Sequence, residues 1–209
     1  MKVIIFEASG LTGRQLIEQA LKQGHEVTAF VRKAGRIPHA HNNLRIVEGD
    51  VLNADEVEQA VIGQDAVLCA IGASGGSPSD ICSEGTGHIL LAMRKAGVPR
   101  IIAVTGFGIS RDSRLQMRFG TKLVVWLSVL LFRRESMDKR QQDSRIRQSG
   151  LSWTIVEPPT LTDGPRTGRY RLDTARAPML GRVSRADVAD FMLDQLDSHE
   201  FNNKSTVIY

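Results

Sequence analysis

Residues 3–13 read Val-Ile-Ile-Phe-Glu-Ala-Ser-Gly-Leu-Thr-Gly, and this stretch decides the fold. The apolar run from Val3 to Phe6 predicts a strand that is buried on both faces, as in parallel sheets. A turn with two glycines follows, and helix-period residues begin at about Arg14. Strand, glycine turn and helix in this order are typical of a dinucleotide-binding unit, in which the helix N-terminus receives a pyrophosphate.

The glycines of this turn match the GxxGxxG pattern of short-chain dehydrogenases at two positions of three. Gly10 would let the backbone approach the pyrophosphate, and Gly13 would let helix and strand pack closely. Leu11 and Thr12 lie between them, and the Thr12 hydroxyl could join the amides of the helix N-terminus. Glu7 stands at the first glycine position. Its carboxylate either points at the pyrophosphate or turns away, and an ordinary strand-to-helix turn without a cofactor is the alternative.

The rest of the chain repeats one order of signals four times: a helix-period segment, a glycine suited to the left-handed conformation, and an apolar run. The glycines are Gly24, Gly63, Gly97 and Gly150, and the strands that they precede are predicted at 25–31, 66–71, 100–105 and 151–156. Helices over 54–62 and 185–196 are predicted from the N-cap pairs Asn53 with Glu56 and Ser184 with Asp187. This alternation predicts an α/β fold with a single doubly wound, Rossmann-type parallel sheet.

Composition indicates one globular domain over residues 1–209, with 42% hydrophobic and 24% charged residues and no repeat or linker. We expect a small substrate-side lobe within about 106–183. Cys69 and Cys82 lack the spacing of a secreted disulfide framework, and no export signal is evident, so a cytoplasmic location is expected.

Several classes of function are disfavoured. Basic residues concentrate in 111–185, but no nucleic-acid-binding motif accompanies them, so an anionic small ligand or a solvated surface explains them equally. The apolar run 123–132 is about half of a membrane span, and we expect it to form a buried or lid helix. The five histidines show no metal-ligand spacing, so no metal is expected.

The end of the second predicted strand indicates the cofactor. NAD-specific folds place an Asp or Glu there, about 20 residues after the last glycine of the turn. Here Arg32 stands at that place, with Lys33 beside it and Arg36 beyond. A guanidinium pairs bidentately with a ribose 2′-phosphate, so we expect NADP(H) rather than NAD(H). A solvated basic turn is the alternative.

Further motifs follow in collinear order along the whole chain: Val31 with Arg32 and Arg36, Gly49-Asp50-Val51-Leu52, Gln64-Asp65-Ala66-Val67, Ser83-Glu84-Gly85, and 149–156 running into Pro158-Pro159 and Asp163. With the phosphate turn, this set resembles the atypical short-chain dehydrogenase group that contains biliverdin-IXβ reductase, also called flavin reductase. It also resembles the bacterial NAD(P)H-binding proteins near the NmrA-like set.

The resemblance implies cofactor contacts at Asp50 and Val51 beside the adenine, Ile71 and Gly72 along the cofactor, Thr105 and Gly106 near the nicotinamide, and Pro158, Pro159, Thr160 and Leu161 behind its ring. The chain departs from its apparent relatives at Gly106, where the reductase has a serine, at Thr160, where it has a histidine, and at Ser136 and Glu157, where the bacterial proteins often have tyrosine and arginine.

Ordinary short-chain dehydrogenases use a tyrosine with a lysine four residues later. The chain has only Tyr170 and Tyr209, and Thr174 follows Tyr170 at that spacing. Hydride transfer to a conjugated acceptor needs mainly close approach to the nicotinamide, and solvent can supply the proton. No catalytic residue is therefore assigned. Lys139 is a candidate for an electrostatic or proton-relay role, with an exposed helix lysine as the alternative.

These observations predict an NADPH-dependent oxidoreductase that passes hydride to a flavin, quinone or bilin-like acceptor. The partner expected is an anionic or aromatic small molecule, with no nucleic acid and no membrane span, and the oligomeric state stays open. Cations that could rim the acceptor site are Arg111, Arg114, Arg166 and Arg169. One alternative is a non-catalytic NADP(H)-binding sensor or regulatory protein of NmrA-like type, and another is a fold in which Glu7 has abolished dinucleotide binding.

Overall fold

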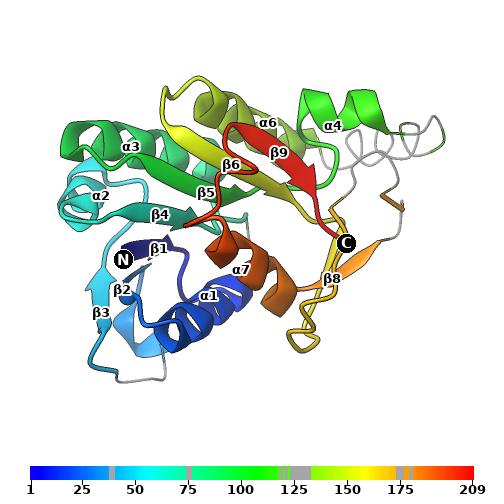
Figure 1. The fold of residues 1–209 in the computed structure, drawn as a ribbon. Coiled ribbons are helices and arrows are strands. Elements are labelled where there is room, and N and C mark those ends of the chain that lie inside the picture. Colours follow the sequence, from blue (N-terminus) through cyan, green and yellow to red (C-terminus); the bar gives the residue numbers. More distant parts are fainter. Residues whose placement is uncertain are drawn as a thin grey trace.

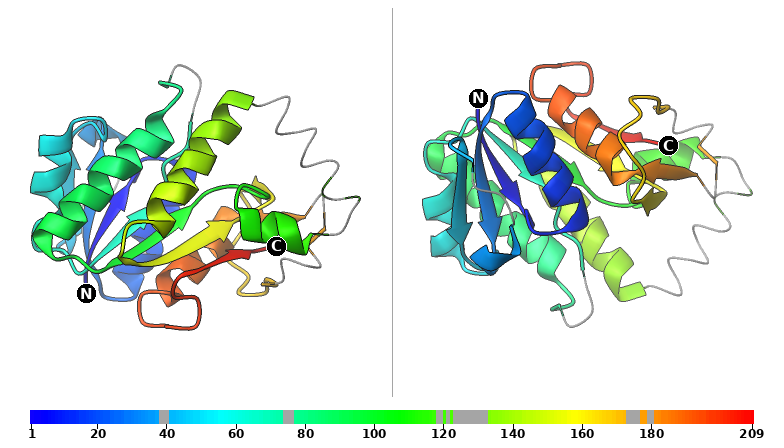
Figure 2. Two further views of the ribbon diagram at one scale, coloured as in Figure 1. Left: turned by 90° about the horizontal axis from the view of Figure 1, so that it is seen from above. Right: turned by 90° about the horizontal axis from the view of Figure 1, so that it is seen from below.

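The computed structural model of the chain has three layers, with a twisted sheet between two layers of helices (Figure 1). Figure 2 shows these helix layers from opposite sides. The structure describes residues 1–37, 41–73, 77–117, 120, 122, 133–172, 177–178 and 181–209. Within these ranges, the side chain of Arg36 is not described.

The main sheet has seven strands, all parallel, in the order β3-β2-β1-β4-β5-β6-β9. The order reverses between β1 and β4, and in such sheets ligands bind beyond the carboxyl ends of the strands at this switch point. The predicted doubly wound, Rossmann-type sheet is therefore confirmed. The strands are β1 (Lys2–Phe6), β2 (Glu26–Val31), β3 (Leu44–Glu48), β4 (Ala66–Cys69), β5 (Arg100–Val104), β6 (Ser152–Glu157) and β9 (Lys204–Val207).

Helices cover both faces of the sheet. Helices α1 and α7 pack together on one face, and α2, α3 and α6 lie on the other (Figures 1 and 2). Two shorter helices, α4 and η1, follow the carboxyl ends of β5 and β2. Their bounds are α1 (Leu11–Lys22), η1 (Ala34–Arg36), α2 (Ala54–Val61), α3 (Ile81–Ala96), α4 (Arg111–Gln116), α6 (Arg133–Arg147) and α7 (Arg185–Asp194).

The segment 106–183, expected as a substrate-side lobe, is divided between two parts of the fold. Strand β6 belongs to the main sheet, and α6 packs on α3. Outside the main sheet, β7 (Thr160–Thr162) and β8 (Arg182–Ser184) form a separate parallel pair near its carboxyl edge (Figure 1). The part beyond the main layers therefore consists of α4 and this strand pair among the described residues.

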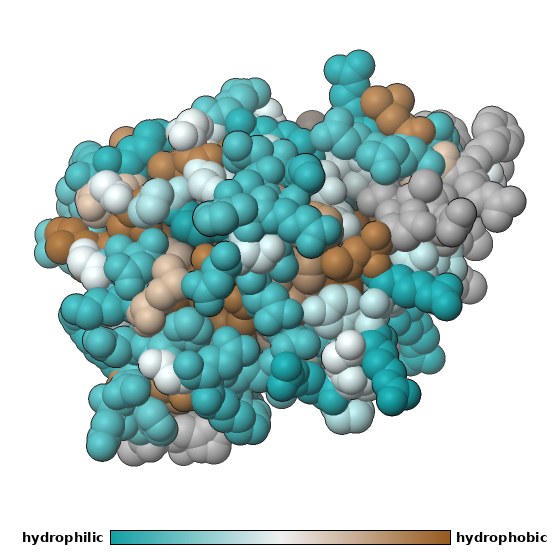
Figure 3. Space-filling model, in the orientation of Figure 1, coloured by the Kyte–Doolittle hydropathy of each residue, from teal (hydrophilic) through white to brown (hydrophobic). Residues whose placement is uncertain are grey.

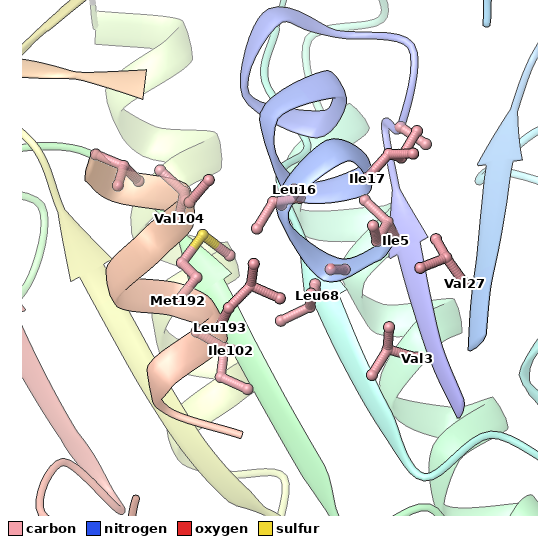
Figure 4. Packing of buried hydrophobic residues seen from close by; sticks show 14 of the residues in the cluster. Val3, Ile5, Leu16, Ile17, Val27, Leu68, Ile102, Val104, Met192 and Leu193 are labelled. Atoms are coloured by element: carbon pink, nitrogen blue, oxygen red, sulfur yellow. The ribbon is translucent and has the colours of Figure 1, made fainter. Parts of the chain in front are cut away.

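The core explains why the strands read as continuous apolar runs. Alternate residues of β1 face opposite helix layers, so Ile5 packs with α1 and α7, whereas Ile4 packs with α2 and α3. Figure 4 shows Ile5, Leu68 and Ile102 pointing from neighbouring strands toward Leu16 and Met192. A strand covered on both sides needs apolar side chains at every position.

The predicted helix-to-strand turns are confirmed. The glycines predicted for the left-handed region have positive φ at Gly24 (81°), Gly63 (76°), Gly97 (71°) and Gly150 (74°). The predicted N-caps are also present, because the Asn53 side chain accepts hydrogen bonds from the amides of Asp55 and Glu56, and Ser184 accepts one from Asp187.

Some features differ from the expectations or lie outside the described residues. Helix α1 begins at Leu11, three residues earlier than expected, and β3 and β9 were not predicted. The apolar run 123–132 lies outside the described residues. None of the described helices is long and apolar enough to cross a membrane. In the view of Figure 3 the described surface is mainly hydrophilic, with apolar residues in scattered patches.

Candidate functional site

A small pocket lies at the switch point, beyond the carboxyl ends of β1, β2 and β4. It brings together residues from four separate sequence motifs: the phosphate turn, the end of β2, the loop after β3 and the loop after β4. The lining consists of Glu7, Phe30, Val31, Arg32, Gly49, Val51, Ile71 and Ile81. Arg32, Val51 and Ile71 of this lining are among the residues expected at the cofactor, whereas Gly10 and Gly13 of the phosphate turn do not line the pocket.

The phosphate turn has the geometry that its two glycines predict. Gly10 is the extended N-cap of α1, and its amide donates to the Glu7 carbonyl at 3.0 Å. A Cβ on Gly13 would lie only 2.3 Å from the Glu7 carbonyl oxygen, so no larger residue fits. No side chain caps α1. The amides of Leu11 and Thr12 in its first turn are therefore not bonded by a cap and can face an anion.

Glu7 has a backbone conformation that favours glycine. Its φ is 59°, in the left-handed region, where a side chain brings strain. Its carboxylate Oε1 lies 3.6 Å from the place that a Cβ on Gly10 would occupy. None of the ion pairs between described residues involves Glu7. The Glu7 carboxylate therefore lies close to Gly10 within the phosphate turn.

Arg32 follows β2 on the exposed side of the pocket. The loop that carries it is fixed by β3, because Glu48 Oε1 accepts from the Ala34 amide at 2.6 Å and the Gly49 amide donates to Val31 at 2.9 Å. No hydrogen bond or ion pair between described residues engages the Arg32 guanidinium. Arg32 can therefore meet a phosphate without first breaking a contact to any described residue. The side chain of Arg36 lies outside the described part of the chain.

The loop after β3 is ordered by its own polar groups. Asp50 Oδ1 accepts from the Leu52 amide at 2.9 Å, and Glu56 Oε2 accepts from the Asp50 amide at 2.7 Å. Val51 packs against α3, where a Cβ on Gly85 would lie 2.8 Å from a Val51 methyl carbon. This contact explains the glycine in the Ser-Glu-Gly motif, and it fixes Val51 at the wall of the pocket.

The residues expected along the cofactor, near the nicotinamide and behind its ring follow the carboxyl ends of β4, β5 and β6, respectively. Ile71 is buried and lines the pocket, whereas Gly72 is exposed. Thr105 is 7% exposed, and its buried hydroxyl has no hydrogen-bond partner among the described residues. Gly106 is half-buried after it. Of the remaining expected residues, Pro159 is half-buried, and Thr160 and Leu161 belong to β7.

Lys139 is not the exposed helix lysine that the alternative interpretation offered. It points from α6 to the strand ends and is partly buried, with Nζ donating to the Ile71 carbonyl at 2.7 Å. It also donates to the Val104 carbonyl at 3.4 Å and to Gln142 Oε1 at 3.2 Å. The ammonium therefore links the segment after β4 to the end of β5 and places a positive charge between them.

A neighbouring residue on α6 caps α3. Asp138 is 4% exposed, and its two carboxylate oxygens accept from the amides of Cys82 and Ser83 at 2.9 and 2.8 Å. The residue at the N-cap position itself, Asp80, makes no side-chain cap hydrogen bond. Asp138, although it belongs to the distant helix α6, thus caps α3 in place of Asp80.

We expect Asp138→Ala to lower the free energy of unfolding by about 1–2 kcal/mol, because two buried amides lose their acceptor. Urea denaturation of the variant measures this change. Asp80→Ala is the matched control and should be nearly neutral, since the Asp80 side chain caps nothing. Equal effects of the two substitutions would contradict the assignment of the cap to Asp138.

Tyr170 is engaged away from the strand ends. Its ring packs edge-on against Phe191, with centroids 6.0 Å apart. Burial, followed by the charges of Asp194 and Asp190, raises the pKa of Tyr170 to about 12, and the hydroxyl is hydrogen-bonded to Asp194. A phenol held in this way stays protonated and bound to α7, which makes it a poor proton donor to an acceptor.

Two of the four candidate rim cations are used inside the protein. Arg114 donates to the carbonyls of Gly108 and Ile109, and Arg166 forms an ion pair with Asp190 at 2.6 Å. Arg111 and Arg169 are exposed.

Comparisons with known proteins agree with this geometry. Residues 8–199 match a family described as NAD(P)H-binding. The YwnB protein of Bacillus subtilis is 30% identical over 218 residues, which cover 98% of this chain and 96% of YwnB.

Two solved structures share the fold over nearly their whole length. A short-chain dehydrogenase/reductase of Veillonella parvula in complex with NADP has a TM-score of 0.82 at 21% identity, covering 99% of this chain and 93% of its own. ChuY of Escherichia coli O157:H7, described as an anaerobillin reductase, has a TM-score of 0.81 at 22% identity, covering 100% and 96%. The family match covers residues 8–199 and so includes most of the main sheet. This chain therefore belongs to the NAD(P)H-binding family of Rossmann-fold, oxidoreductase-like proteins.

Proposed function

We propose that the protein is an NADPH-dependent reductase that passes a hydride to a conjugated acceptor, such as a flavin, a quinone or a bilin-like tetrapyrrole. One observation carries the proposal. The pocket joins the phosphate turn and Arg32, which no described residue engages, to strand ends from which the Tyr170 hydroxyl is withdrawn by its hydrogen bond to Asp194.

The cofactor side of the proposal rests on complementary charge. The N-terminus of α1 carries partial positive charge toward the diphosphate. Arg32 stands where a 2′-phosphate would lie, and a guanidinium matches a phosphate with two parallel hydrogen bonds. Lys33 adds exposed positive charge beside it. Among the described residues, Glu7 is the only acidic one that lines the pocket, and it opposes the diphosphate without removing the other contacts.

The acceptor side rests on what hydride transfer requires. When bound, the nicotinamide supplies a hydride from its C4, and a conjugated acceptor needs close and parallel approach more than a positioned acid. Lys139 stabilises the strand ends on which such an acceptor would lie, and its ammonium favours the electron-rich product. Arg111 and Arg169 are exposed cations that suit phosphate or propionate groups. The description of ChuY as an anaerobillin reductase supports a tetrapyrrole-like acceptor.

The protein has two cysteines, Cys69 and Cys82, and both are free and buried. Burial raises the pKa of the Cys82 thiol to about 11, so it stays an unreactive thiol. These features support a reducing compartment such as the cytoplasm.

The experiment that tests this function measures the loss of NADPH absorbance when FMN, a quinone or biliverdin is added to purified protein. Thermal unfolding with NADPH, NADH, NADP and FMN runs in parallel, because a ligand at about 100 times its dissociation constant stabilises the fold by roughly 2.7 kcal/mol. Stabilisation by NADPH together with acceptor-dependent oxidation supports the reductase. No stabilisation by either nicotinamide cofactor would overturn it.

A non-catalytic NADP(H)-binding sensor is the second candidate. It is favoured by the strained Glu7 in the phosphate turn, which weakens binding to a range suited to sensing, and by the absence of the tyrosine of ordinary short-chain dehydrogenases. The same assay separates the two, since a sensor is stabilised by NADPH but leaves NADPH unoxidised with every acceptor.

We expect Tyr170→Phe to leave the turnover with FMN within a few fold of the unaltered protein, because the phenol is bound to Asp194 and not presented to the acceptor. Steady-state kinetics measure this effect. Loss of a general acid typically costs a hundredfold or more. A loss of that size in a normally folded variant would show that Tyr170 reaches the acceptor.

A further inference from the structure

Helix α3 holds Val51, a wall residue of the switch-point pocket, by two contacts. The ring of His88, which is half-buried, places Nδ1 3.0 Å from the Val51 carbonyl oxygen. A carbonyl oxygen only accepts hydrogen bonds, so Nδ1 carries the hydrogen and donates it. About one turn earlier, Gly85 leaves room for the Val51 side chain, because a Cβ on Gly85 would lie 2.8 Å from both Val51 γ-carbons. One face of α3 therefore fixes both the main chain and the side chain of Val51.

The peptide that joins Val51 to Leu52 is held at both of its polar groups. Its carbonyl accepts from His88, and its amide, that of Leu52, donates to Asp50 Oδ1 at 2.9 Å. Because a peptide unit is planar, engaging both groups fixes the orientation of the whole unit. Glu56 of α2 holds the peptide before it, through the amide of Asp50. Among the described residues, His88 is thus the one that ties the Val51–Leu52 peptide to a packed helix.

Val51 lies on the side of the pocket that suits the adenosine half of NADP(H). The lining also contains Arg32, which we assign to the 2′-phosphate, and this phosphate is carried by the adenosine ribose. An apolar surface beside it suits the flat purine ring. The other apolar residues of the lining are Phe30, Val31, Ile71 and Ile81. His88 is not part of the lining, so any effect that it has on the cofactor passes through Val51.

We propose that His88 is a positioning residue of the cofactor site, which holds Val51 in the conformation that receives the adenosine half of NADP(H), while Gly85 provides the space for the Val51 side chain. This inference rests on the cofactor assignment within the proposed function. A loop that spends only a fraction of its time in the binding conformation binds its ligand more weakly by that fraction. Loss of the His88 contact therefore weakens binding of the adenosine half and leaves the other half unaffected.

The test compares two substitutions of His88 that have nearly the same shape. His88→Asn keeps an N–H donor one bond beyond Cγ, where the imidazole has Nδ1, whereas His88→Leu places a methyl group there. Each variant is titrated with NADPH and with the two halves of the cofactor, adenosine 2′,5′-bisphosphate and reduced nicotinamide mononucleotide. Thermal unfolding of each variant without ligand checks the fold.

We expect His88→Leu to weaken the binding of NADPH and of adenosine 2′,5′-bisphosphate by about three- to tenfold, which is the usual effect of losing one hydrogen bond. The affinity for reduced nicotinamide mononucleotide should not change, because this half does not reach Val51. His88→Asn should keep most of the affinity for the adenosine half. A contact that serves folding alone would lower the unfolding temperature and leave all three affinities of the folded protein unchanged.

Gly85→Ala tests the same wall by a separate route, which also serves where His88→Leu folds poorly. The added methyl group would meet both γ-carbons of Val51, so Val51 must move away from α3. The affinity for adenosine 2′,5′-bisphosphate should fall here too. Gly87→Ala is the matched control on the same helix, because its methyl group meets the end of the Arg145 side chain instead. It should leave the affinities for both halves unchanged.

The outcomes separate this inference from the proposed function. A folded His88→Leu variant that keeps its affinity for adenosine 2′,5′-bisphosphate, or that loses affinity equally for both halves, overturns the inference and leaves the reductase intact. So does a Gly85→Ala variant that behaves like Gly87→Ala. An unaltered protein that binds NADPH but oxidises none with any acceptor overturns the reductase and leaves the role of His88 standing. An unaltered protein that binds neither NADPH nor adenosine 2′,5′-bisphosphate overturns both.

Discussion

Replacing Glu7 by glycine is expected to tighten NADPH binding by about a hundredfold. The Glu7 carboxylate lies beside Gly10, the residue at which we propose that the diphosphate approaches the backbone. At about 5 Å, a carboxylate and a phosphate charge repel by roughly 3 kcal/mol at an effective dielectric of 20, which corresponds to about a hundredfold in affinity. Glycine also relieves the strain of a side chain at a φ of 59°.

Titration of both forms with NADPH at one low salt concentration measures the effect, and a second titration at high salt should show a smaller difference because ions screen the charge. Glu7→Gln is the matched control, since it removes the charge but keeps the strained backbone. It should account for most of the gain in affinity. Weaker NADPH binding by Glu7→Gly would mean that the glutamate contributes to the site, and our account of the turn would be wrong.

Replacing Arg32 by aspartate is expected to abolish or invert the preference for NADPH over NADH. A charge-assisted contact to the 2′-phosphate contributes roughly 1.5–3 kcal/mol, or about 10- to 150-fold in affinity. Aspartate removes this contact, repels the 2′-phosphate and offers the ribose hydroxyls of NADH an acceptor. Dissociation constants for both cofactors, measured before and after the substitution, give the change in preference.

Lys33→Asp controls for the change in net charge, because it makes the same change one residue away. It should weaken NADPH binding less than Arg32→Asp and should leave a preference for NADPH. Equal affinities of the unaltered protein for the two cofactors would show that Arg32 does not bind the 2′-phosphate, and the cofactor preference would have to be withdrawn.

The main sheet was predictable where local signals agree with tertiary structure. Buried strands such as Val3–Phe6 are apolar at every position, and glycines such as Gly97 occur where the chain must turn left-handed. Strand β3 escaped prediction because it is an edge strand with several exposed positions, so its side chains do not form an apolar run. Strand β9 likewise carries polar residues at one end.

Part of the pocket lining was predictable, but the interactions of its residues were not. The motifs that contain Arg32 and Val51 each follow a strand, and parallel strands bring their carboxyl ends together. The environment of a side chain depends on distant elements, however. The sequence alone shows Lys139 only as a lysine on a helix. In the structure its Nζ donates hydrogen bonds to the carbonyls of Ile71 and Val104. From the sequence, Glu157 is only a departure from related proteins, whereas in the structure it is buried and accepts a hydrogen bond from Ser113 of α4.

The position of β9 in the sheet has a consequence for how the protein is made. Strand β9 pairs with β6 over Thr154–Glu157, so β6 remains an open edge while the ribosome has yet to add residues 204–207. An unpaired apolar edge is prone to pair with other chains. The nascent protein therefore carries this open edge during the last part of its synthesis, from the completion of β6 at Glu157 until residues 204–207 are added.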